Sequence, residues 1–202
     1  MSVSEQATGI LGGSFDPVHL GHVAIAHSFL TSGYITELWI LLTPESPHKK
    51  GHKFADFALR LEMLERAFEA EKKVTISTIE HQLDPPFYTV NTLRYLSKRY
   101  PERSFRLCIG EDSLADFDTW HNWKKILNYA PLLVASRASY QIENPAPEIV
   151  DQMQFVDHHP VEISSTEIRD RLKKGRSITD LVPPGIEQII NNYNLYRSRQ
   201  HG

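Results

Sequence analysis

Short apolar runs alternate with amphipathic stretches along this chain. Six of the runs are almost continuously apolar, which is typical of strands that are buried on both faces of a parallel sheet. The predicted strands cover residues 9–11, 37–42, 74–79, 104–109, 131–135 and 154–156.

Between the strands, apolar residues recur with the spacing of one helix face. The predicted helices cover residues 23–32, 54–70, 89–100, 120–128, 165–174 and 185–196. This alternation predicts an α/β fold, a doubly wound, Rossmann-like parallel sheet with right-handed crossovers. Ligands of such folds bind at the carboxyl ends of the strands. We expect one domain over residues 1–202, with a core over about 8–162 and a small C-terminal helical portion over about 163–200.

Composition narrows the class of protein. The chain is 41% hydrophobic and has a formal net charge of −3, so it lacks the basic balance of a general nucleic-acid binder. The single cysteine, Cys108, lies in an apolar run, where we interpret it as a core residue, and it fits a reducing cytoplasm. The first residues show neither a basic segment nor a long apolar run, and no window has the length of a membrane span.

The segment from Gly12 to His22 reads Gly-Gly-Ser-Phe-Asp-Pro-Val-His-Leu-Gly-His. A glycine turn between a strand and a helix lets backbone N–H groups approach a phosphate, and the helix N-terminus adds partial positive charge. His19 and His22, three residues apart, share one side of that helix start. They could instead be ordinary surface or core histidines. A zinc site would need further ligands, and no matching cluster is evident in the sequence. The combination points to chemistry on a nucleoside triphosphate.

A second motif, Ile-Ser-Ser-Thr-Glu-Ile-Arg, occupies residues 163–169. Ser164 or Ser165 is a natural N-cap for the helix that follows. The motif could be an ordinary capped helix start with Arg169 on an exposed face. A capped helix start also binds phosphate, and Arg169 lies one turn into the helix. Nearby cations are more simply an exposed face: Arg171, Lys173 and Lys174.

The two motifs together resemble the G-T/S-F-D-P-x-H-x-G-H and I-S-S-T-x-I-R motifs of the H-x-G-H nucleotidyltransferases. The resemblance implies the nucleotidyltransferase type of Rossmann-like fold, and catalytic roles for His19 and His22 at the α-to-β phosphate region of ATP. It also implies a set of ATP-binding residues: Gly12, Gly13, Ser14, Phe15, Asp16, Ser164, Ser165, Thr166 and Arg169.

The middle of the chain resembles nicotinate mononucleotide adenylyltransferases within that superfamily. The matching segments are Pro-His-Lys at 47–49, Tyr-Thr at 88–89, Gly-Glu-Asp-Ser-Leu at 110–114, Thr-Trp-His-Asn-Trp at 119–123, Arg137 and Ile-Thr-Asp-Leu-Val-Pro at 178–183. The chain departs from the family pattern at Phe87, Asn91, Glu111 and Ala138-Ser139. Arg60 also matches, and is as plausibly structural as ligand-binding.

This second resemblance implies the residues that bind the mononucleotide: His48, Lys49, Tyr88, Thr89, Gly110, Asp112, Trp120 and Arg137. Trp120 would stack on the pyridine ring, Asp112 would bind ribose hydroxyls, and Arg137 would meet the mononucleotide phosphate. Trp123, three residues after Trp120, is expected to pack into the core.

The implied reaction transfers AMP from ATP to nicotinate mononucleotide and gives nicotinate adenine dinucleotide and pyrophosphate, a step of NAD biosynthesis. Mg²⁺ would bridge the ATP phosphates, and we assign it no protein ligands. The expected partners are these two nucleotides, with no nucleic acid and no membrane, and homo-oligomerisation is left open. The alternatives are an adenylyltransferase for nicotinamide mononucleotide or phosphopantetheine, a cytidylyltransferase, or a nucleotide-binding regulator without activity.

Overall fold

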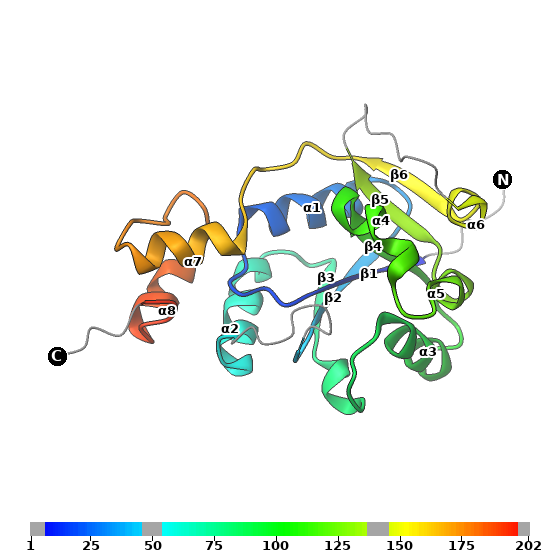
Figure 1. Ribbon diagram of the computed structural model, residues 1–202, viewed down its shortest axis with the longest axis horizontal. Coiled ribbons are helices and arrows are strands. Elements are labelled where there is room, and N and C mark those ends of the chain that lie inside the picture. Colours follow the sequence, from blue (N-terminus) through cyan, green and yellow to red (C-terminus); the bar gives the residue numbers. More distant parts are fainter. Residues whose placement is uncertain (1–6, 46–53, 137–145, 198–202) are drawn as a thin grey trace.

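The computed structural model describes residues 7–45, 54–136 and 146–197. In this part of the chain, six strands form one parallel sheet in the order β3-β2-β1-β4-β5-β6 (Figure 1). The strands are β1 (Ala7–Gly13), β2 (Glu37–Leu42), β3 (Val74–Ser77), β4 (Ser104–Gly110), β5 (Leu132–Ser136) and β6 (Met153–Asp157). Because β1 pairs with both β2 and β4, the strand order reverses beside β1. This confirms the predicted doubly wound sheet and puts its switch point at the end of β1.

Helices connect the strands and cover both faces of the sheet (Figure 1). The α-helices are α1 (Leu20–Thr31), α2 (Phe57–Phe68), α3 (Thr89–Arg99), α4 (Glu111–Ala115), α5 (Trp123–Tyr129), α6 (Pro147–Val150), α7 (Ser165–Lys173) and α8 (Ile186–Asn192). Two short 3-10 helices, η1 (Ile79–Gln82) and η2 (Phe117–Thr119), complete the described elements. None of the described helices has the length and apolar character needed to cross a membrane.

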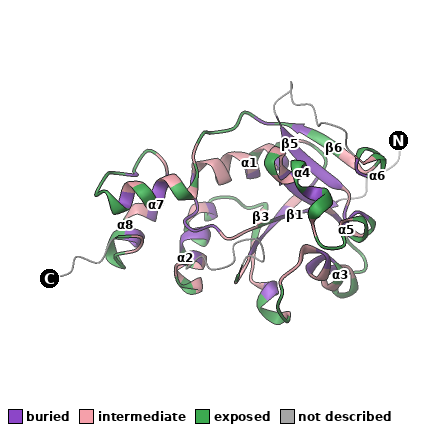
Figure 2. Cartoon of the chain, in the orientation of Figure 1, coloured by how far each residue is buried: buried purple, intermediate pink, exposed green. Residues whose placement is uncertain are grey.

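Successive strand residues contribute to two separate apolar clusters. Leu38, Ile40 and Leu42 of β2 pack with α1, α2, α7 and α8 on one face. Trp39 and Leu41, which lie between them in sequence, pack with α3 to α6 on the other face. The strands in the centre of the sheet are accordingly almost entirely buried (Figure 2). The continuous apolar runs in the sequence follow from this double covering. The predicted C-terminal helical portion shares the first of these clusters, through Ile168 and Ile186 among others.

Several predicted boundaries are wrong. The strand predicted over residues 74–79 ends at Ser77, because the chain turns into η1. The helix predicted from Trp120 starts at Trp123, since Trp120 is extended (φ −68°, ψ 141°) and Asn122 has a left-handed φ of 55°. The last helix ends at Asn192, before two further left-handed residues, Asn194 and Tyr196. The short helices α4 and α6 were not predicted, because one or two turns carry little periodicity.

Two core predictions are tested directly. Cys108 is buried within β4, with 2% of its surface exposed, and burial raises the pKa of its thiol. Trp123 is only half-buried, although it packs against the core on the α3 side of the sheet. The first prediction is confirmed, and the second holds in part, because Trp123 packs against the core without being buried.

Candidate active site

The first motif lies at the carboxyl end of β1, where the chain enters α1. His19 is the N-cap of α1, and Gly21 and His22 occupy its first turn. Gly21 is required by close packing: a Cβ there would lie 3.0 Å from His19 Nδ1 and 3.4 Å from the carbonyl oxygen of Val161. A larger residue between the two histidines would therefore displace the His19 ring.

The two histidine rings are stacked, with their centroids 3.7 Å apart. The backbone N–H of His19 donates to Nδ1 of His22 at 3.2 Å, so the proton of a neutral His22 ring is on Nε2. His19 is 7% exposed, and burial lowers its pKa to about 4. Nδ1 of His19 has no hydrogen-bond partner among the described residues. The pair thus combines a neutral, buried imidazole with a ring whose tautomer the backbone selects.

The loop between Gly13 and His19 is held rigidly from outside. Phe15 has a φ of 44°, a strained conformation for a residue with a side chain. Arg60 of α2 donates to the carbonyl of Ser14 at 2.8 Å. The Asp16 carboxylate accepts from the hydroxyl of Tyr196 at 2.7 Å and from the N–H of Ala55 at 3.1 Å. Two parts of the chain that are far from the loop in sequence, residues 55–60 and Tyr196, therefore fix it.

Arg60 is structural by its contacts, which decides the open question about this residue. It is 2% exposed and donates to the carbonyl oxygens of Ser14, Thr43, Pro44 and Ala55 at 2.8–3.1 Å. All of its guanidinium nitrogens are thereby used on the backbone.

The second motif meets the first. The Ser165 hydroxyl donates to the carbonyl of Pro17 at 3.0 Å, and Arg169 donates to the carbonyl of Asp16 at 2.8 Å and to the Thr166 hydroxyl at 3.0 Å. Ser164 is the N-cap of α7, and its hydroxyl accepts from the N–H of Glu167 at 3.1 Å. The sequence did not decide whether Ser164 or Ser165 is the N-cap of this helix, and the structure assigns the cap to Ser164.

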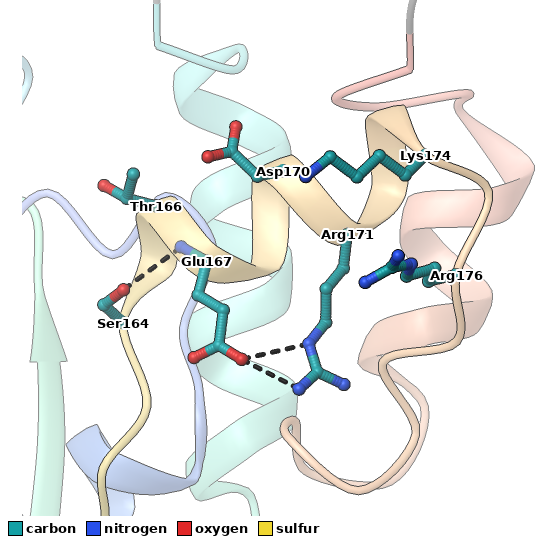
Figure 3. Close-up of a pocket in the computed structure, with 7 residues that line it drawn as sticks. All are labelled: Ser164, Thr166, Glu167, Asp170, Arg171, Lys174 and Arg176. Carbon is teal, nitrogen blue, oxygen red and sulfur yellow. Dashed lines mark hydrogen bonds and ion pairs between the residues drawn. The ribbon is translucent and has the colours of Figure 1, made fainter.

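A hollow of mixed charge adjoins the start of α7 (Figure 3). Its lining residues are Ser164, Thr166, Glu167, Asp170, Arg171, Lys174 and Arg176. Arg171 pairs with Glu167 at 2.8 Å, and Lys173 pairs with Asp170 at 2.9 Å on the helix surface. The expected exposed face of α7 is therefore present, although Arg171 is half-buried.

A cavity of about 340 Å³ opens beside the two histidines. Its lining combines groups from the ends of β4, β5 and β6 with the start of α1: His19, Gly21, His22, Ile25, Gly110, Glu111, Asp112, Ala135, His158, Pro160, Val161, Glu162 and Ile163. The cavity thus lies at the carboxyl edge of the sheet, where the fold predicts a ligand. Of the residues predicted to bind the mononucleotide, Gly110 and Asp112 line this cavity together with His19 and His22.

The predicted ATP residues differ in accessibility. Gly12 is exposed and Ser14 is half-buried. The side chains of Phe15 and Asp16 are buried, at 2% and 1% exposed, so a ligand would reach these two positions only through their backbone. Gly13 is constrained by packing, since a Cβ there would lie 2.9 Å from the Phe15 ring.

The other mononucleotide residues lie apart from this cavity. Tyr88, the N-cap of α3, stacks on His121 with ring centroids 4.3 Å apart, and Thr89 begins the helix. Trp120 tilts against Phe117 at 5.4 Å. Tyr88 and Trp120 are both half-buried against the same apolar cluster. His48, Lys49 and Arg137, as well as the Ala138-Ser139 departure, lie outside the described residues.

Sequence reasoning missed two residues of the site. His158 lines the cavity directly after β6, and Tyr196 holds Asp16 from beyond the last helix. The position of His158 at the carboxyl end of a parallel strand is a signal that could have identified it. No local pattern marks Tyr196, because its partner is 180 residues away.

Comparisons with known proteins identify the family of this chain. A model of the cytidylyltransferase-like family matches residues 10–171. A probable nicotinate-nucleotide adenylyltransferase of Flavobacterium johnsoniae is 35% identical over 94% of this chain and 98% of its own length. The corresponding protein of Exiguobacterium sibiricum is 36% identical, over 93% and 97%.

A solved structure shares the fold. The nicotinic acid mononucleotide adenylyltransferase of Plasmodium falciparum, complexed with NaAD, superposes with a TM-score of 0.77 at 22% identity, covering 95% of this chain and 98% of that one. Together with the two sequence motifs at one end of the sheet, the relatives confirm the family that the sequence resembles. The chain belongs to the nicotinate-nucleotide adenylyltransferases, nucleotidyltransferases of the cytidylyltransferase-like family with a place in NAD biosynthesis.

Proposed function

We propose that this chain transfers the AMP of ATP to nicotinate mononucleotide, with nicotinate adenine dinucleotide and pyrophosphate as products. The observation that carries the proposal is the junction of the two motifs. Ser165 and Arg169 of α7 donate to the loop that leads into His19 and His22, beside a cavity at the carboxyl edge of the sheet.

In the proposed reaction, a phosphate oxygen of the mononucleotide attacks the α-phosphorus of ATP. The bond from that phosphorus to the bridging oxygen of the β-phosphate breaks, and pyrophosphate leaves with the electron pair. The acceptor supplies its own nucleophile, so catalysis requires positioning and stabilisation of charge. His22 suits this role, because its Nδ1 accepts from the backbone and Nε2–H then faces a ligand as a donor.

The remaining ATP contacts follow from backbone and helix dipole. Gly12, Gly13 and Ser14 offer N–H groups at the end of β1, and the first turn of α7 offers Ser165 and Thr166. Both are suited to phosphate oxygens. Arg169 would add a charged donor at the junction, next to its contact with Asp16.

Magnesium is proposed to enter with ATP, bridging the phosphates and offsetting their charge. Among the described residues, no group of three or more His, Cys, Asp or Glu side chains is arranged to hold a metal ion. Mg²⁺ would then be held mainly by phosphate oxygens and water, and we assign it no protein ligands.

The acceptor is proposed to lie across Gly110, Asp112 and Trp120, with Tyr88 and Thr89 nearby. Two half-buried aromatic rings on one apolar cluster suit a flat pyridine ring. Contacts from His48, Lys49 and Arg137 remain predictions of the resemblance. We infer a cytoplasmic location from the single, buried Cys108.

The experiment is pyrophosphate release with ATP and Mg²⁺, comparing nicotinate mononucleotide, nicotinamide mononucleotide and phosphopantetheine as acceptors. The proposal expects a strong preference for the nicotinate acceptor. Preference for another acceptor would contradict the proposed pocket around Trp120 while keeping the chemistry at His22. Binding of both nucleotides without pyrophosphate release would contradict catalysis and favour a regulator.

A further inference from the structure

His158 is a buried imidazole that the proposed reaction does not use. It follows β6, where its backbone N–H donates to the carbonyl of Ser136 at 2.9 Å. It is 8% exposed, and its ring lines the cavity with His19 and His22. Nδ1 of His158 lies 3.0 Å from the hydroxyl of Ser28 on α1. This contact fixes the ring orientation, and Nε2 makes no hydrogen bond to the described residues.

The charged groups that line the cavity determine which way round a nucleotide would lie in it. Glu111, Asp112 and Glu162 line the cavity together with His158, and their carboxylates repel phosphate. The charge of Glu111 also acts on His158. The triphosphate therefore belongs with His19 and His22 at the start of α1. The base and ribose, which carry no charge, are left for the part with His158.

The apolar part of the cavity lining suits a flat base. Ala135, Pro160, Val161 and Ile163 line the cavity, and apolar walls with few polar groups are typical of sites for aromatic ligands. Burial lowers the pKa of His158, although the charge of Glu111 opposes the shift. A neutral imidazole presents one donor and one acceptor, which matches the edge of a neutral base better than a phosphate.

We propose that His158 is a specificity-determining residue for the nucleoside triphosphate, with its Nε2 hydrogen-bonded to the edge of the adenine base. This inference rests on the proposed function. With Nδ1 occupied by Ser28, Nε2 offers the base a single donor or acceptor, so a base with the wrong group at that edge leaves a buried polar atom unpaired. Such mismatches discriminate between ligands more strongly than apolar contacts do.

The test measures kcat and KM for ATP, GTP and CTP in the wild type and in His158→Ala, His158→Gln and Ser28→Ala. Losing one hydrogen bond to the base should raise the KM for ATP by about 3- to 10-fold in His158→Ala, with kcat little changed. The preference for ATP over GTP should fall by a similar factor. The KM for nicotinate mononucleotide should stay constant. Gln carries its amide near the position of Nε2, so His158→Gln should recover part of the preference. Ser28→Ala should show a smaller loss in the same direction.

His159→Ala is the matched control, because His159 is an exposed histidine in the same loop and does not line the cavity. It should leave the preference for ATP unchanged. An unchanged preference in His158→Ala would overturn the proposal, as would a loss confined to kcat or to thermal stability. Titration of a non-hydrolysable ATP analogue, compared with its GTP counterpart, measures the preference without turnover. The role of His158 in nucleotide preference can therefore be tested even if the wild type shows no adenylyl transfer.

Discussion

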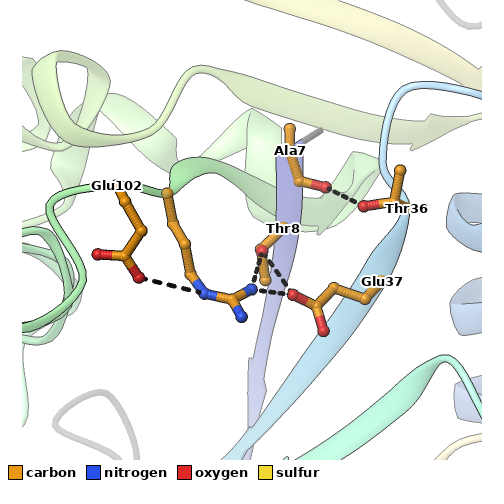
Figure 4. Close-up of polar contacts among 6 residues, drawn as sticks. Ala7, Thr8, Thr36, Glu37 and Glu102 are labelled. Atoms are coloured by element: carbon orange, nitrogen blue, oxygen red, sulfur yellow. Dashed lines mark hydrogen bonds and ion pairs between the residues drawn. The ribbon is translucent and has the colours of Figure 1, made fainter. Parts of the chain in front are cut away.

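At the amino ends of the strands, which we call the amino edge of the sheet, polar side chains bond to one another. Thr8 of β1 donates to Glu37 of β2 at 3.0 Å, and Arg103, just before β4, donates to Thr8 at 3.1 Å and pairs with Glu37 (Figure 4). The guanidinium also lies over the Trp39 ring, 5.1 Å from its centroid. Each of these side chains has a protein partner. Thr8 is buried, whereas the side chains of Arg103 and Glu37 are 36% and 32% exposed.

The carboxyl edge of the same sheet is built differently. Its buried polar residues include His19 and Glu80, and two of their atoms, Nδ1 of His19 and Oε2 of Glu80, have no hydrogen-bond partner among the described residues. Each such atom costs about 1–3 kcal/mol. The amino edge thus contributes to stability, whereas the carboxyl edge keeps costly polar atoms, one of them on a residue that lines the cavity. This difference is expected between a structural edge and a binding edge.

The largest expected effect is on turnover at the carboxyl edge. Replacing His22 with Ala removes a donor to the transferring phosphate and should lower kcat by about 100- to 1000-fold. Pyrophosphate release measures the loss, and thermal unfolding should change little. His27→Ala, an exposed histidine on the same helix, is the control. A variant that loses folding rather than turnover would contradict the catalytic role.

Substitution of Arg60 tests whether the carboxyl edge depends on buried hydrogen bonds to its backbone. Arg60→Met leaves four carbonyl oxygens without their donor, and we expect a loss of about 3 kcal/mol in the free energy of unfolding. Denaturant titration measures it. Arg66→Met, on the exposed face of α2, should cost far less, and equal losses in the two variants would refute the structural role of Arg60.

The buried His19 predicts a pH dependence of stability. Its folded pKa of about 4 lies below the value of about 6.5 in an unfolded chain. The unfolded state therefore binds the extra proton first, and stability falls as pH drops from about 6.5 to 4, by about 2–4 kcal/mol. Below that window this contribution changes no further. His19→Asn should flatten the slope, and an unchanged slope in that variant would assign it to other groups.

Tyr196 gives a smaller effect. Tyr196→Phe removes the hydroxyl that donates to Asp16 and should cost about 1 kcal/mol, with a raised KM for ATP because the loop before His19 loosens. Denaturant titration and steady-state kinetics report the two effects. Tyr193→Phe, at an exposed tyrosine of the same segment, should change neither the stability nor the KM for ATP. A loss of stability with no change in KM would limit Tyr196 to a structural role.

The smallest effect belongs to the amino edge. Glu37→Gln weakens a half-exposed ion pair, which is worth about 0.5 kcal/mol or less after solvent screening. Stability should fall slightly and kcat should be unchanged. A large change in kcat would contradict the assignment of a purely structural role to the amino edge.

Much of the fold could be predicted from local pattern. Apolar runs identified all six strands of the sheet. The most continuous of them belong to strands such as β2 and β5, because burial on both faces leaves a mark in the sequence. Helix limits were less accurate where one residue redirects the backbone, as the left-handed Asn122 does before α5. The two motifs were recognisable because each is a contiguous segment at a strand or helix end.

The sequence by itself determined the order of strands and helices, the two motifs and the family they indicate, because each of these depends on residues close together in the chain. Only the tertiary structure decided that Arg60 supports the backbone, that Tyr196 holds Asp16 and that His158 lines one cavity with the histidine pair. These roles depend on the proximity of residues distant in sequence. Packing of the complete sheet and its helices creates such contacts, and no local periodicity encodes them.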